Sequence, residues 1–187
     1  MRLIPTILMA CLAGSALAQP AAPPKAAPRP ALTLSTTAFE DGGVIPDQYT
    51  GAGAHPGSPM LAWTNVPAGV ATFVMIMHDT DVAAQKKAED NLHWMVFNIP
   101  ASTTGLPEGE PATANLPDGT VQAKSSRGAV GYMPPGAPAG PYHHYIFELY
   151  GLDTKLDVGP DATRADVLKA MDGHVVAKAS VTGRFHR

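Results

Sequence analysis

The sequence predicts a mainly β protein built from two packed antiparallel sheets. From Leu32 onward, short apolar runs alternate with breaks rich in Gly, Pro, Asn and Asp, a pattern typical of strands joined by turns. The 187 residues include 18 Gly and 19 Pro, which interrupt most segments before a helix could form. Only one segment combines helical spacing with capping residues, so we expect one or two short helices beside the sheets.

Five segments have the composition of strands, and they differ in their expected burial. Residues 32–39 (LTLSTTAF) alternate apolar and polar side chains, as an edge strand does. Residues 71–79 (ATFVMIMHD) and 92–100 (LHWMVFNIP) are almost continuously apolar, which indicates strands that are covered on both faces. The other two strands are expected at residues 143–152 and 174–185.

The clearest helix is expected over residues 164–171 (RADVLKAM). Thr163 and Asp166 have the spacing of a capping box, in which each residue satisfies a backbone N–H of the other. Gly173 stands where a helix C-terminal cap commonly lies. Residues 83–90 are polar and are compatible with either a second short helix or a loop.

The first 18 residues have the features of a secretory signal peptide. Arg2 gives a positive start, residues 3–12 form an apolar run too short to span a bilayer, and Ala16-Leu17-Ala18 offers small residues for cleavage. Residues 8–11 resemble a bacterial lipoprotein box ending at Cys11, but that reading leaves a very short leader. We therefore expect cleavage after Ala18 and secretion, in a bacterium to the periplasm.

Residues 19–31, rich in Pro and Ala, are expected to form an extended linker to one domain over residues 32–187. Cys11 is the only cysteine, so the mature chain has no disulfide and depends on a packed core.

Loss of Arg2 with the leader leaves 12 basic against 16 acidic residues, a net charge of −4. Because no run of basic residues exists, we expect no nucleic-acid binding.

Ionisable side chains stand at one end of three predicted core strands. A single histidine at a strand end is usually a hydrogen-bonded surface residue, and two aspartates after a strand usually form a turn. Three such ends together favour a binding site if the strands are neighbours. The side chains concerned are Asp79, Asp81, His93, His143 and Tyr145.

Strand alternation predicts which of these side chains share a face. Successive residues of a strand point to opposite sides, so His143 and Tyr145 are expected on one face. The same rule places His93 on one face with Met95 and Phe97. A face that opens with an imidazole and a phenol before turning apolar is typical of the floor of a pocket.

Five motifs occur in a distinctive order along the chain. They are SPMLAWTNVP (58–67), MIMHDTD (75–81), LHWMVFNIP (92–100), HHYIFELYGL (143–152) and MDGHVVAKASVTGRF (171–185). Together they resemble the phosphatidylethanolamine-binding protein family, and more narrowly its bacterial Raf-kinase-inhibitor-like branch, over roughly residues 32–187. The resemblance implies a Greek-key antiparallel β-sandwich with a small pocket at one end that takes phosphate, sulfate, acetate or a phospholipid headgroup.

The resemblance also implies the residues of that pocket. His143 faces the ligand and His144 faces the other side of the strand, while Asp81 stands behind the residues in contact. The ligand-binding residues carried over from the motifs are Asp79, His93, Pro135, His143 and Tyr145.

An anion pocket needs donors, and His93, His143 and the Tyr145 hydroxyl can supply them. A carboxylate repels an anion, so we expect Asp79 to accept an N–H from a pocket histidine and to favour its cationic form. Binding should then strengthen as pH falls, with dissociation constants on the order of millimolar to micromolar. The expected partner is a small anion or a phosphorylated headgroup, including that of a membrane lipid, with no cofactor; a homodimer is left open.

Three other functions are alternatives to anion binding. A hydrolase with His93 as base lacks a Gly-x-Ser-x-Gly motif and a cysteine nucleophile, so we expect no enzyme. A weak metal-dependent hydrolase could use Asp79, His93 and His143 around zinc, although no local histidine spacing supports a metal site. The third alternative is a protein-interaction module or a regulator of a protease or hydrolase.

The leader generates the first prediction. The exported protein should begin at Gln19, because the Ala-x-Ala site follows the apolar run. Intact-mass measurement of the periplasmic fraction of an expressing bacterium checks this. A lipidated protein beginning at Cys11 would contradict cleavage after Ala18 and establish the lipoprotein reading.

Overall fold

A computed structural model describes residues 31–82, 86 and 88–187. The predicted signal peptide and all but the last residue of the predicted linker lie outside the described residues. So do residues 83–85 and 87, which belong to the segment considered for a second helix. Within the described ranges, no helix has the length and apolarity needed to cross a membrane.

The described residues fold into two sheets with one α-helix, as expected. The six-stranded sheet has the order β2-β9-β8-β4-β5-β7, and the three-stranded sheet has the order β1-β3-β6. All pairings are antiparallel except that of β2 with β9. The elements are β1 (Thr33–Ser35), β2 (Gly43–Val44), the 3-10 helix η1 (Asp47–Tyr49), β3 (Leu61–Thr64), β4 (Thr72–Asp79), β5 (Asn91–Pro100), β6 (Gly105–Leu106), β7 (Val121–Gln122), β8 (His143–Leu152), α1 (Arg164–Met171) and β9 (Val175–Phe185).

The four long predicted strands are confirmed as β4, β5, β8 and β9. Every residue of β4 is buried, as its continuous apolar run indicated. The predicted edge strand over residues 32–39 is confirmed only as the three-residue β1, which does lie at a sheet edge. Sequence reasoning did not predict η1 or the short strands β2, β3, β6 and β7.

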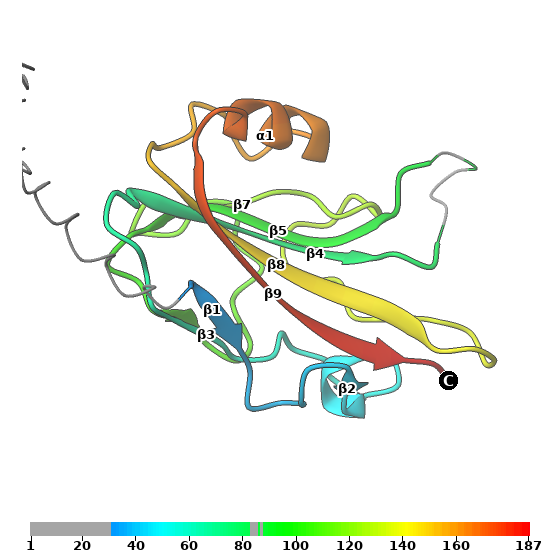
Figure 1. The fold of residues 1–187 in the computed structure, drawn as a ribbon. Coiled ribbons are helices and arrows are strands. Elements are labelled where there is room, and N and C mark those ends of the chain that lie inside the picture. The colour runs from blue at the N-terminus through cyan, green and yellow to red at the C-terminus, as the bar shows by residue number, and fades with distance from the viewer. Residues whose placement is uncertain (1–30, 83–85, 87) are drawn as a thin grey trace, which may run out of the picture.

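The large sheet is covered on both faces (Figure 1). Its inner face packs on the three-stranded sheet through a core that includes Phe73, Met75 and Met77. Its outer face packs on α1 through a second core that includes Val74 and Ile76. The alternation of β4 residues between the two cores explains why its sequence is apolar throughout.

The predicted helix is confirmed with its caps. The Thr163 hydroxyl accepts the backbone N–H of Asp166 at 3.2 Å, and the Asp166 carboxylate accepts the backbone N–H of Thr163 at 2.9 Å. Gly173 follows the C-terminal cap with a φ of 83°, a left-handed conformation that glycine adopts without strain. The helix therefore begins and ends at the residues that the sequence predicted.

The pairing of β4 with β5 slips by one residue at His93. Met77 lies opposite Trp94, whereas the next residue of β4 lies opposite Leu92, so His93 has no partner of its own. Such a bulge inserts one residue and turns the side chains that follow it to the other face.

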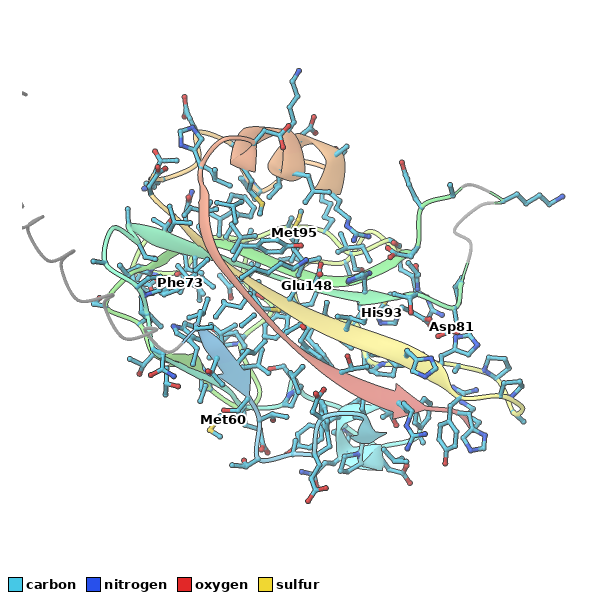
Figure 2. The ribbon with its side chains drawn as sticks, in the orientation of Figure 1. Met60, Phe73, Asp81, His93, Met95 and Glu148 are labelled. Carbon is cyan, nitrogen blue, oxygen red and sulfur yellow. The ribbon has the colours of Figure 1, made fainter. Side chains whose placement is uncertain are left out.

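The prediction that His93 shares a face with Met95 and Phe97 was therefore wrong. Met95 and Phe97 belong to the core under α1. His93 lies on the inner face, where its ring meets the edge of the Tyr145 ring at a centroid distance of 5.1 Å. Met95 points toward α1, and His93 lies near the end of the sheet that carries Asp81 (Figure 2).

Gly183 of β9 lies opposite Tyr145, and its close packing leads to a prediction about stability. A Cβ atom there would lie 2.4 Å from Ile45 Cγ1 and 2.9 Å from Phe39 Cε2. Gly183→Ala should therefore lower the free energy of unfolding by about 1–3 kcal/mol through overpacking, measured by chemical denaturation. The control Gly159→Ala meets no atom within 4 Å and should change it by less than about 0.5 kcal/mol. Equal effects would contradict the packing argument.

Candidate functional site

The centre of the candidate site is a hydrogen-bonded pair at the ends of two neighbouring strands. Asp79 ends β4 and His143 begins β8. The His143 Nδ1–H donates to Asp79 Oδ2 at 2.9 Å, and the backbone N–H of Asp81 donates to Asp79 Oδ1 at 3.0 Å. Asp79 is 2 % exposed, so these donors compensate the burial of its carboxylate.

The pair leaves His143 with one uncommitted nitrogen. Because Nδ1 carries the proton given to Asp79, Nε2 of the neutral ring holds a lone pair, and it becomes a donor only in the imidazolium. The side chain is 16 % exposed, so small ions can reach it.

His93 is held in one tautomer by its neighbours. Its Nδ1–H donates to the carbonyl oxygen of Met133 at 2.8 Å, and its Nε2 accepts an N–H of the Asn91 side chain at 3.0 Å. Burial lowers the pKa of His93, more than the Met133 carbonyl and the Asp79 carboxylate raise it. The buried ring is therefore neutral at pH 7 when no anion is bound.

The Tyr145 hydroxyl is a buried donor with no completed hydrogen bond among the described residues. The Asp79 carboxylate and the backbone of Gly136 and Ala137 lie close to it, but none is placed at hydrogen-bonding geometry. Burial and the nearby carboxylate raise the pKa of Tyr145 well above its ordinary value, so the hydroxyl keeps its proton.

Pro135 belongs to the wall of the site. It is buried, and its carbonyl oxygen accepts the backbone N–H of Gly51 at 2.7 Å. The next two residues along this segment, Gly136 and Ala137, border the Tyr145 hydroxyl. Pro135 thus shapes the site through its backbone.

Asp81 lies beside the site and binds His144. Its Oδ2 accepts the backbone N–H of His144 at 2.7 Å and faces the ring Nδ1 at 3.0 Å. Partial burial would raise the pKa of Asp81, but the bonds from His144 outweigh it and lower the pKa. Asp81 therefore fixes the start of β8, and His144 faces away from Asp79 as the sequence predicted.

The structure thus brings together Asp79, His93, His143 and Tyr145, with Pro135 at the wall, and adds one side chain that sequence reasoning missed. Asn91 lies opposite Asp79 in the sheet and holds His93 Nε2. Its position two residues before His93 was the available signal.

A second group of ionisable residues lies on the outer face. His78 Nδ1 lies 2.5 Å from Asp90 Oδ2, and its Nε2 lies 3.3 Å from Glu148 Oε2 without the alignment of a hydrogen bond. Burial would lower the pKa of His78, but the two carboxylates outweigh it and raise the pKa. Contacts with His78, Lys178 and Tyr150 lower the pKa of Glu148 to about 2.

No three His, Cys, Asp or Glu side chains within residues 31–82, 86 and 88–187 are grouped so that they could hold a metal ion. A hollow of about 1000 Å³ lies beside the N-terminal end of α1 and is lined in part by Asp90, Arg127 and Arg164. Asp79, His93, His143 and Tyr145 do not line it. The hollow and the grouped polar residues therefore lie in different places, and the uncommitted Tyr145 hydroxyl and His143 Nε2 favour the site around Asp79.

Comparison with known proteins gives clear relatives. The sequence profile named Phosphatidylethanolamine-binding protein matches residues 35–186. A protein of Methanothermobacter thermautotrophicus named UPF0098 protein is 42 % identical over 156 residues, which are 83 % of this chain and 99 % of that protein. The UPF0098 protein YbhB of Escherichia coli is 34 % identical over 160 residues, which are 82 % of this chain and 99 % of YbhB.

Solved structures give the same family. A phosphatidylethanolamine-binding protein homologue from Chlamydia trachomatis is 32 % identical, with a TM-score of 0.75 over 84 % of this chain and 98 % of the homologue. YbcL of E. coli, described as a member of the mammalian PEBP family, is 28 % identical, with a TM-score of 0.70 over 83 % of this chain and 98 % of YbcL. This chain belongs to the phosphatidylethanolamine-binding protein family.

Proposed function

We propose that this protein, exported by its leader, binds a small anion or a phosphorylated headgroup without catalysing a reaction. The observation that carries the proposal is the grouping of uncommitted polar atoms around Asp79. His143 Nε2 is free of the Asp79 bond, and the Tyr145 hydroxyl is buried without a completed hydrogen bond among the described residues. A buried donor without an acceptor is costly, and a ligand oxygen would relieve that cost.

Proton uptake would accompany anion binding at this site. Neutral His143 presents a lone pair at Nε2, and neutral His93 accepts from Asn91 there, so neither donates to an anion in that form. Protonation turns both nitrogens into charged donors, which bind anions more strongly than neutral donors do. Affinity should therefore rise as pH falls.

The family name supports the class of ligand. The matching profile and the Chlamydia homologue carry the name of a phosphatidylethanolamine-binding protein, and that headgroup contains a phosphate. Within such a headgroup, the geometry around Asp79 favours binding of the phosphoryl group, because the site offers histidines that can become cationic donors.

A hydrolase is the second candidate, because the Asp79–His143 pair is also an arrangement that orients a general base. Turnover of simple phosphate or carboxylate esters that disappears in His143→Ala would favour it. Binding without turnover would favour the proposal above.

The ligand prediction is tested with inorganic phosphate and phosphoethanolamine. At pH 6 both should shift the NMR signals of the His93 and His143 rings, and His143→Ala should weaken binding about tenfold or more, as for loss of one charged hydrogen bond. The control His174→Ala removes a histidine that also pairs with an aspartate, Asp153, at 2.8 Å. His174→Ala should bind as the wild type does. Unshifted His93 and His143 signals at tens of millimolar anion would refute the proposal.

The role of Asp79 is tested by Asp79→Asn. The carboxylate raises the pKa of His93, so its neutralisation should lower that pKa further and weaken anion binding near pH 7 by several-fold. The pKa is followed by NMR titration of the His93 ring, and Asp153→Asn is the matched control for loss of one charge beside a histidine. Tighter anion binding by Asp79→Asn would show that Asp79 merely repels the ligand.

A further inference from the structure

Arg187 lies at the edge of the candidate site. It follows β9, whose last residue, Phe185, lies opposite His143 and is buried in the inner core. The end of β9 is at the same end of the sheet as the start of β8 (Figure 1). The final residues of β9 therefore run directly beside His143.

The Arg187 guanidinium lies near Pro135 and Gly136, in the segment that forms the wall of the site. A Cβ atom built on Gly51 would lie 3.5 Å from Arg187 Nη2, 3.3 Å from the Pro135 carbonyl oxygen and 3.9 Å from Gly136 Cα. Gly136 in turn borders the Tyr145 hydroxyl. The cation and that buried donor thus lie near the same short backbone segment.

A cation at this edge would offset the charge of Asp79. When His93 and His143 are neutral, Asp79 leaves the site with one negative charge that repels anions. Among the described residues Arg187 makes no ion pair with a carboxylate, so its charge is available to a ligand. A guanidinium keeps its charge at every physiological pH and matches phosphate with two parallel donors.

Resting on the proposed function, we propose that Arg187 binds the ligand directly and makes the site selective for dianionic phosphoryl groups over carboxylates. The histidines supply the part of the affinity that depends on pH, and Arg187 supplies the part that does not. Gly51 lies beside the guanidinium, because a Cβ atom there would make ordinary van der Waals contact with Arg187 Nη2 at 3.5 Å.

The test compares inorganic phosphate with acetate at pH 6 and pH 8.5 by calorimetry. Arg187→Gln should weaken phosphate binding about tenfold or more and acetate binding by less than about threefold, and should abolish the phosphate binding that wild type retains at pH 8.5. Arg187→Lys, which keeps the charge but loses the paired donors, should fall between the two. The control Lys169→Gln removes one positive charge from α1, across the sheet from Asp79, and should bind as wild type does.

The outcomes separate this inference from the proposed function. If Arg187→Gln retains the phosphate-over-acetate preference while His143→Ala loses binding, the inference is wrong and the proposed function stands. If Arg187→Gln and Lys169→Gln weaken phosphate binding equally, the effect is one of net charge and the inference is also wrong. If wild type binds neither anion, both fail.

Discussion

The buried carboxylate of Asp79 is the group on which the site depends. An ionised carboxylate in a protein interior is costly unless its oxygens are hydrogen-bonded. Here one oxygen accepts the Asp81 backbone N–H and the other accepts His143 Nδ1–H. The same residue therefore fixes the turn that leaves β4 and orients the imidazole that begins β8. The bond to Asp79 therefore commits His143 Nδ1 as a donor and leaves Nε2 outside the pair.

The predictions about strands succeeded where alternation is regular and failed where the backbone departs from it. In β4 and β8 the side chains divide between the two cores as period two requires. In β5 the pairing slips at His93, and slips again just before Ile99, where Asn98 has a φ of 57°. An extra residue is a property of the pairing with β4, so the sequence of β5 by itself does not reveal it. The shortest strands, with two to four residues, are too brief to show any period.

The site was predictable to the extent that its side chains lie within recognisable motifs. Asp79, His93, His143 and Tyr145 do, and the fold brings them together. The Met133 carbonyl that fixes the tautomer of His93 is a backbone group, which leaves no mark in a side-chain pattern. Arg187 reaches Gly51 only because β9 runs beside β8 and ends there. Such contacts depend on tertiary structure and had no signal in the local sequence.

Two histidines on opposite faces of the same sheet have opposite electrostatic environments. His78 lies between Asp90 and Glu148, which raise its pKa, so its charge is already neutralised within the protein. Burial lowers the pKa of His93, and the nearby charge of His78 lowers it further. His78, Asp90 and Glu148 are thus paired by charge with one another, whereas on the inner face the Tyr145 hydroxyl has no completed hydrogen bond among the described residues and His143 Nε2 lies outside the Asp79 bond. In the proposed function an incoming anion would gain little from the outer network, because a cation there would first have to leave its carboxylate. On the inner face the proposed anion would complete the environment of groups that Asp79 and Met133 have already oriented.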